Sequence, residues 1–290
     1  MKPSTFIDRI FFAISIKHAS DCQCYTIAMA IGIIGGSGLY DIEGFGKMEE
    51  ISVSTPYGAP SSIYKRFFAG DREVIFLARH GIPHRIPPHN VNYLANIWGL
   101  KSLGVKEIIS IGAVGGISSE MLPGSIVVLD QIIDMTMGAR PATFYDEGKV
   151  VHVDFTLPFC SALRDVLINS AGHAGIEVKE RGTYVCCNGP RLETAKEIQF
   201  FSQIGADVVG MTVMPEAALA RELEMCYAGI AVVANYAPGV GSGMLTVTEV
   251  VETMRNYLGH IKSLLTEAIS QMPTQRTCAC KTALKNAEVI

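Results

Sequence analysis

Short runs of apolar, β-branched residues recur along the chain, and longer segments of mixed polarity separate them. Five of these runs are apolar on both faces, which predicts strands buried inside a sheet. They cover residues 30–34, 73–78, 107–111, 207–209 and 229–234, and a sixth strand is expected at 125–129, after the turn "LPG".

The segments between these runs show helical patterns. Residues 90–103 repeat apolar side chains at intervals of three and four, and Gly104 follows as a stop signal. Pro215 opens a helix over 216–226, and Thr246-x-x-Glu249 is a capping box at the start of a helix of roughly twenty residues. Alternating strands and helices predict one α/β domain, with a central mixed, largely parallel twisted sheet flanked by helices.

Polar and glycine residues follow the predicted strands. Ligands of such sheets bind at the carboxyl ends of the strands, so these residues should meet there. Main-chain N–H groups, hydroxyls, a guanidinium and an imidazole together favour an anion. The residues concerned are Gly35–Gly38, Arg79 and His80, Gly112–Val114, Met211 and Thr212, and Asn235.

The glycine cluster after the first strand resembles a dinucleotide fingerprint only in part. That fingerprint requires G-x-G-x-x-G, whereas the chain reads G-S-G-L-Y-D from Gly36, and it also lacks the lysine of a P-loop. We therefore expect a small free anion, with phosphate as the candidate and Ser37 as a hydroxyl donor. The alternative is a plain tight turn.

Composition narrows the class further. The net charge is −4 and 49% of residues are hydrophobic, with no basic stripe for nucleic acid and no apolar run long enough for a membrane span. Lys17 interrupts the only apolar stretch near the start, so no export signal is predicted and a cytoplasmic location is expected. Residues 1–28 are expected to be an extension, disordered or a misplaced start, before a domain over 29–272 and a cysteine-containing tail over 273–290.

The chain has eight cysteines, four of them in two CxC pairs, Cys22/Cys24 and Cys278/Cys280. These four thiols could in principle bind zinc, but CxC is not the usual spacing, and no metal site is predicted. Intracellular disulfides would fit a hyperthermophilic source. His84 and His89 lie in a loop without helical spacing and are not expected to form a metal pair.

Several long motifs resemble one known family, the trimeric purine nucleoside phosphorylases and methylthioadenosine phosphorylases. The matching motifs occur in family order over about residues 31–265, and the methylthioadenosine branch fits best. They are "GIIGGSGLYD", "ARHGIPHRIPPHNVNYLANIWGLKSLGV", "GPRLETAKEI", "GADVVGMTVMPEAALARELEMCYA" and "ANYA". The resemblance implies the nucleoside phosphorylase fold, purine salvage by phosphorolysis, inorganic phosphate as co-substrate with no cofactor, and a homotrimer or a homohexamer built as a dimer of trimers.

The resemblance also assigns roles to residues. Ser37, Arg79, His80 and Thr212 would hold phosphate beside the Ala113 backbone, although the family usually has a hydroxyl residue where this chain has Gly112. Met211 would lie against the ribose, and Leu192, Glu193 and Asn235 would contact the base. His80, Glu193 and Asn235 are the expected catalytic residues.

Base specificity can be argued from Glu193 and Asn235. A carboxylate accepts from N1–H of a 6-oxopurine, and a carboxamide donates to O6 or N7. The 6-amino-specific branch has aspartates at the positions of Asn235 and Ala237 and a small hydroxyl residue at the position of Glu193. We therefore expect 6-oxopurine nucleosides, because a mismatched pocket leaves buried polar groups unpaired. Glu193 could also serve as a carboxylate in the first turn of a helix.

The 5′ end of the sugar is less defined by the sequence. Val247, Val250 and Val251 lie where the methylthio branch has an apolar pocket, and His152 matches a histidine that comes from the neighbouring subunit there. The valines could equally be ordinary helix core, so methylthioinosine, inosine and guanosine all stay candidates. Cys160 and Cys226 match positions that pair as a disulfide in some thermophilic relatives, and two reduced core thiols are the alternative.

Other functions remain to be weighed against this hypothesis. An adenine-specific methylthioadenosine phosphorylase is the nearest alternative. A nucleosidase would use water in place of phosphate and leave Arg79, His80 and Thr212 without their anion. A non-catalytic nucleoside-binding protein and a nicotinamide dehydrogenase are more distant, and the dehydrogenase lacks its glycine fingerprint.

Overall fold

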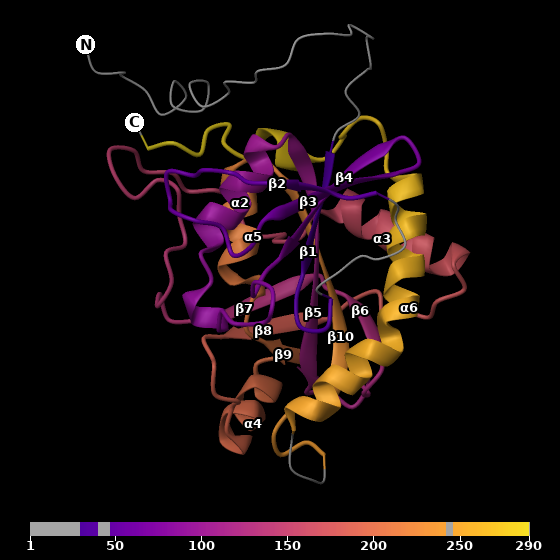
Figure 1. The fold of residues 1–290 in the computed structure, drawn as a ribbon. Coiled ribbons are helices and arrows are strands. Elements are labelled where there is room, and N and C mark those ends of the chain that lie inside the picture. The colour runs from indigo at the N-terminus through magenta and orange to yellow at the C-terminus, as the bar shows by residue number, and fades with distance from the viewer. Residues whose placement is uncertain (1–29, 40–46, 242–245, 290) are drawn as a thin grey trace, which may run out of the picture.

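A mixed sheet forms the centre of the computed structural model, which describes residues 30–39, 47–241 and 246–289 (Figure 1). Ten strands belong to the sheet in this part of the chain. Along its main path the order is β2 (Glu49–Ile51), β3 (Tyr64–Ala69), β4 (Arg72–Ala78), β1 (Ala30–Gly35), β5 (Val105–Gly116), β9 (Val208–Gly210), β8 (Thr183–Cys187) and β7 (Gln131–Met135). β10 (Cys226–Tyr236) pairs with β5, and β6 (Ile126–Val128) pairs with β10.

The central strands run parallel. β1 is parallel to β4 and β5, β10 is parallel to β5, and β7, β8 and β9 are parallel to one another. Antiparallel pairing occurs at β2–β3–β4, at β6–β10 and where β9 meets β5. The predicted α/β class with a mixed, largely parallel sheet is confirmed.

Helices cover both faces of the sheet, so that its central strands are buried on each side (Figure 1). α2 (Tyr93–Ser102) and α5 (Val213–Glu222) pack on one face, and α3 (Ser161–His173) and α6 (Val247–Gln271) pack on the other. β1 shows why its pattern is apolar throughout: Ile34 faces the first pair of helices, whereas Ile31 and Ile33 face the second. α4 (Ala195–Gln203) covers a smaller third cluster.

The predicted strands are all present, but two are longer than expected. β5 continues to Gly116 and β10 to Tyr236, so Gly112–Val114 and Asn235 lie inside strands and not after them. The reason is that β5 pairs with β10 from Glu107 to Gly116, which keeps both strands extended after β1 has ended.

The predicted helices need corrections at their boundaries. α2 begins at Tyr93, after the short 3₁₀ turn η1 (Pro88–Asn90), and the capping box of Thr246 and Glu249 starts the 25-residue α6. The helix expected over 216–226 is wrong at its end, because α5 ends at Glu222 and Cys226 is already the first residue of β10. Residues 223–225 form the turn between α5 and β10, and only Cys226 of the predicted helix end belongs to the buried strand.

A second 3₁₀ turn, η2 (Ala279–Thr282), lies in the tail expected over 273–290. No helix among the described residues is long and apolar enough to cross a membrane. The expected extension over residues 1–28, with Cys22 and Cys24, lies outside the described residues, as does the side chain of Val247.

Candidate active site

A pocket opens where β1 ends alongside β5. β1 pairs with β5 as far as Ile111, and β9 takes over the same path only at Gly115, which leaves Gly112–Val114 uncovered between them. The amide of Ala113 is two residues beyond Ile111, whose carbonyl accepts from Gly36 in place of a β1 residue. Main-chain groups two residues apart on a strand point to the same side, so the Ala113 amide is directed into this gap.

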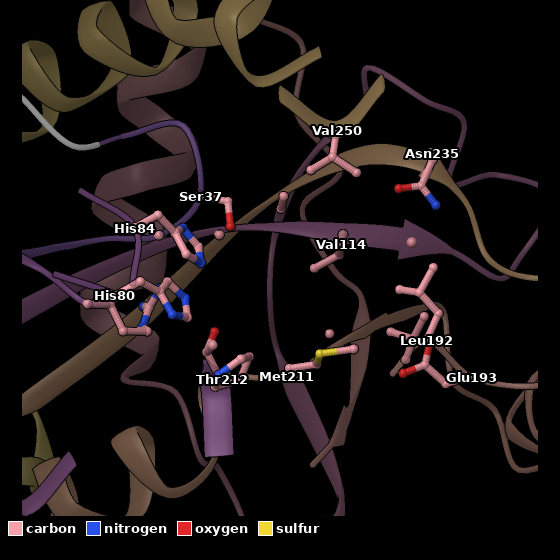
Figure 2. A pocket seen from close by; sticks show the side chains of 18 of the residues that line it. Ser37, His80, His84, Val114, Leu192, Glu193, Met211, Thr212, Asn235 and Val250 are labelled. Carbon is pink, nitrogen blue, oxygen red and sulfur yellow. The ribbon is translucent and has the colours of Figure 1, made fainter. Parts of the chain in front are cut away.

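The pocket lining contains most of the predicted site residues. Most come from the carboxyl ends of strands and the loops beside them, as expected for the carboxyl edge of a parallel sheet, and Val250 comes from α6. The predicted residues in the lining are Ser37, Arg79, His80, Ala113, Leu192, Glu193, Met211, Thr212, Asn235 and Val250. In Figure 2, Ser37, His80 and Thr212 lie toward one end, Leu192, Glu193 and Asn235 toward the other, and Met211 between them.

Gly36 and Ser37 form one wall of the first end. A Cβ added at Gly36 would come within 2.8 Å of both Arg79 Nη1 and the carbonyl oxygen of Ile111, so only glycine fits this close approach. Thr212 stands opposite as the residue preceding α5, and its side chain makes no capping hydrogen bond. Its hydroxyl lines the pocket next to Tyr184, whose hydroxyl accepts from the Thr212 amide at 3.2 Å.

Arg79 is buried beneath this wall and paired with a second buried residue. Its Nε and Nη2 donate to the two carboxylate oxygens of Glu216 at 2.5 and 3.0 Å, Nη2 donates to Ser110 at 2.6 Å, and Nη1 donates to the carbonyl of Ile111 at 3.2 Å. A guanidinium has five N–H donors, and the one left over is on Nη1, next to Gly36. Arg79 is thus a neutralised cation that offers the pocket a single N–H.

His80 presents a neutral ring to the pocket. Nδ1 lies 2.8 Å from the carbonyl of Ile86 and must donate to it, so the unprotonated Nε2 is an acceptor. Burial, followed by the charge of Arg79, lowers the pKa of His80 to about 3. His84 stacks on this ring at a centroid distance of 4.3 Å and also lines the pocket, whereas His89 does not.

Glu193 and Asn235 mark the other end of the pocket. Glu193 is 8% exposed, and its buried Oε1 has no hydrogen-bond partner in the described part of the protein. Burial raises the pKa of this carboxyl above its usual range. Asn235 donates from Nδ2 to the carbonyl of Tyr236 at 2.6 Å, which leaves one N–H and the Oδ1 acceptor for a ligand.

Arg140 holds the start of the loop that carries Glu193, which follows β8. Arg140 is 5% exposed and donates to the carbonyls of Cys187, Asn188 and Met214. Thr194 and Glu197 then form a capping box at the start of α4. Glu193 precedes this cap, so it is not the first-turn helix carboxylate that the sequence allowed; Glu197 occupies that place.

Some predicted residues lie outside the lining. Val251 is 37% exposed and His152 is exposed, and neither lines this chain's pocket, whereas Val250 does. Ala237 is 1% exposed and packs in the cluster under α4, so it faces the core and not the pocket.

Sequence reasoning missed the roles of three residues. The sequence marked His84 only as a possible metal ligand. Its stacking on His80 depends on a loop conformation that cannot be predicted from the hydrophobic pattern. Glu216 stands among apolar neighbours on α5, which is the signal of a buried paired charge. Arg140 lies in an irregular segment, where nothing in the pattern shows its partners.

Comparison with known proteins agrees with this geometry. A family model described as the Phosphorylase superfamily matches residues 30–270. The chain is 55% identical over 257 residues to the probable S-methyl-5′-thioinosine phosphorylase of Thermodesulfovibrio yellowstonii, covering 89% of this chain and 96% of the relative. It is 53% identical over 264 residues to the 6-oxopurine nucleoside phosphorylase of Pyrococcus furiosus, covering 89% and 98%.

A solved structure has the same fold. The methylthioadenosine phosphorylase of Schistosoma mansoni in complex with adenine superposes with a TM-score of 0.85 at 34% identity, covering 89% of this chain and 98% of that one. The chain belongs to the phosphorylase superfamily, and the resemblance found in its motifs is confirmed.

Proposed function

We propose that the protein catalyses phosphorolysis of 6-oxopurine nucleosides. Inorganic phosphate attacks C1′ of the sugar, the C1′–N9 bond breaks, and its electron pair leaves with the purine, which takes up a proton. The products are the free base and ribose 1-phosphate, or methylthioribose 1-phosphate when the nucleoside carries a 5′-methylthio group. Such a reaction serves purine and methylthionucleoside salvage.

One observation carries this proposal: the buried, unpartnered Oε1 of Glu193 shares a pocket rim with the amide of Asn235. An ionised carboxylate accepts from N1–H of hypoxanthine or guanine, and the remaining N–H of Asn235 donates to O6 or N7. Adenine has no hydrogen on N1, which would leave Oε1 of Glu193 buried without a partner. The names of the Thermodesulfovibrio and Pyrococcus relatives support the same choice.

The opposite end of the pocket suits the phosphate. Ser37, Thr212, the Ala113 amide and the last N–H of Arg79 are donors, and Nε2 of His80 can accept from a protonated phosphate oxygen. As the C1′–N9 bond lengthens, positive charge grows on the sugar and negative charge on the purine. A phosphate held near the sugar stabilises the first, and Asn235 stabilises the second.

The 5′ side is apolar in the part that can be described. Val250 is half-buried and lines the pocket near Asn235 (Figure 2), and such a wall favours a methylthio group over a hydroxyl. Methylthioinosine is therefore the preferred substrate, with inosine and guanosine accepted. Adenine-specific cleavage of methylthioadenosine is the second candidate, because the Schistosoma protein with this fold was solved with adenine bound.

The deciding experiment is base release from methylthioinosine, inosine, guanosine, methylthioadenosine and adenosine, each with and without phosphate. We expect phosphate-dependent release that is fastest for methylthioinosine. Faster cleavage of methylthioadenosine would replace this proposal by the second candidate, and release at the same rate without phosphate would identify a nucleosidase.

We further propose that the active form is a homotrimer or a dimer of trimers. His152 is exposed and lies outside its own chain's pocket, which fits a residue that completes the pocket of a neighbouring subunit. Light scattering combined with an activity assay tests this, since a fully active monomer would contradict it. The cytoplasmic location stays a prediction.

A further inference from the structure

Four cysteines meet at the end of the molecule opposite the pocket. The sulfur atoms of Cys160, Cys226, Cys278 and Cys280 all lie within 4.8 Å of one another, and all four are free thiols. Three of the residues are buried and Cys278 is half-buried. Since β10 begins at Cys226 and reaches the pocket rim at Asn235, one strand separates the two sites.

The cluster joins three segments of the chain. Cys160 is the residue before α3, Cys226 opens β10, and Cys278 and Cys280 flank and enter the turn η2. The sequence analysis weighed only the four cysteines of the two CxC motifs as zinc ligands and predicted no metal site. The fold instead brings one CxC motif to two cysteines that are distant in sequence.

We propose that these four cysteines form a structural zinc site. A tetrahedral site with Zn–S bonds of about 2.3 Å places its sulfurs about 3.8 Å apart. The Sγ atoms of Cys226 and Cys278 are 3.3 Å apart, and the other pairs lie within 4.8 Å, so shifts below about 1 Å complete the tetrahedron. Four protein ligands leave no open position, which is the pattern of a structural and not a catalytic zinc.

Charge balance at the cluster agrees with a metal. Zn²⁺ binds thiolates, so each thiol that coordinates releases its proton to solvent, and four thiolates around Zn²⁺ carry a net charge of −2. Arg276 lies beside them, with Nη1 at 4.0 Å from Cys226 Sγ and hydrogen-bonded to the carbonyl of Glu224 at 2.7 Å. Such an outer cation offsets the excess charge and donates N–H toward sulfur.

The zinc would fix the C-terminal tail to the domain. After η2 the tail returns along the segment that precedes His152: the His152 amide donates to the carbonyl of Ala287 at 2.8 Å, and Val289 donates to Val150 at 3.0 Å. Lys149 also pairs with Glu288 at 2.7 Å. A metal at the cluster therefore holds both the tail and the segment that carries His152.

The test begins with the unmodified chain, purified without added reductant so that any disulfides persist, and dialysed against zinc and then buffer. We expect one zinc per chain by elemental analysis. Replacement by Co²⁺ should give the visible absorption of tetrahedral cobalt together with sulfur-to-metal charge transfer. Thiols titrated in denaturant without reductant should number eight per chain, since metal-bound cysteines become reactive when the fold is lost.

The double variant Cys278→Ser/Cys280→Ser should lose the zinc and become open to proteolysis in the tail. The control is Cys22→Ser/Cys24→Ser, which removes the same motif elsewhere and should keep one zinc. Fewer reactive thiols in the unmodified chain without bound metal would mean disulfides and overturn the proposal. So would eight reactive thiols with no zinc or cobalt bound, and neither result requires a variant that folds.

Discussion

The buried pair of Arg79 and Glu216 gives the sharpest prediction. Four donors converge on the Glu216 carboxylate: Nε and Nη2 of Arg79, the Ser110 hydroxyl at 3.2 Å and the Tyr227 hydroxyl at 2.8 Å. Glu216→Gln removes the charge and turns one acceptor into an NH₂ that faces donors. The side chains of the pair are 1% and 0% exposed, so water cannot replace the lost partner.

The expected cost follows from that burial. Leaving one charge of a buried pair uncompensated costs about 3–5 kcal/mol. Glu222→Gln is the matched control on the same helix, because Glu222 is also buried but accepts only from neutral groups, the Thr143 hydroxyl at 2.8 Å and the Phe144 amide at 2.7 Å. Its loss should be about 1 kcal/mol, the value of an ordinary hydrogen bond.

The assay is urea unfolding of both variants at one protein concentration, followed with and without phosphate. Saturating phosphate should restore more stability to Glu216→Gln than to Glu222→Gln, because the bound anion supplies a new counter-charge near Arg79. Equal losses for the two variants would refute the idea that Arg79 is held as a buried cation. If phosphate restored the same stability to both variants, Arg79 would not be part of the anion site.

Three further predictions concern substrate choice and phosphate. Asn235→Asp should raise the ratio of methylthioadenosine to methylthioinosine cleavage by roughly tenfold or more, because it replaces an N–H donor of the pocket by a carboxylate acceptor. Ala237 is left unchanged, because an aspartate there would enter the core. The pKa of Glu193 is raised, so this carboxyl becomes protonated at a higher pH than an ordinary glutamate as the pH is lowered. Protonation removes the acceptor for N1–H and creates a donor for adenine N1. The ratio of methylthioadenosine to methylthioinosine cleavage should therefore rise as pH falls, and a flat profile would count against the role of Glu193. Gly112→Ser should lower the KM for phosphate about tenfold by adding a hydroxyl donor, because in the described part of the chain a Cβ there would have only Thr212 Oγ1 within 4 Å, at 3.9 Å. An unchanged KM would mean that phosphate binds elsewhere.

The central strands were predictable because they are buried on both faces and leave an unambiguous apolar run, as in β1. Residues at strand ends could then be assigned to one edge of the sheet without knowing any contact. The edge strand β2 and its neighbour β3 were not foreseen, and β2 is largely exposed and carries two glutamates. β7 has no fully buried residue, and its place in the sheet depends on pairing with β8.

Within the site, side-chain types were predictable and their partners were not. The sequence indicates that Arg79 follows a strand, but not that Glu216, 137 positions later, neutralises it. Likewise the cysteine cluster combines a core strand, a helix start and the tail. Such long-range pairings depend on the packing of the whole domain, so they cannot be predicted from the local sequence pattern.

The neutralisation of Arg79 explains how the proposed phosphate site can be stable before phosphate binds. An unpaired guanidinium at 1% exposure would be too costly to keep in an empty site, and Glu216 removes that cost while tying β4 to α5. In the proposed function, the pocket would then attract phosphate through oriented neutral donors, namely the Ala113 amide and the hydroxyls of Ser37 and Thr212, more than through net charge. Because those donors are fixed by strand and helix ends, they need little rearrangement when charge shifts during the reaction. The same contact that stabilises the fold therefore prepares the site, so the stability and the phosphate response of Glu216 variants should change together.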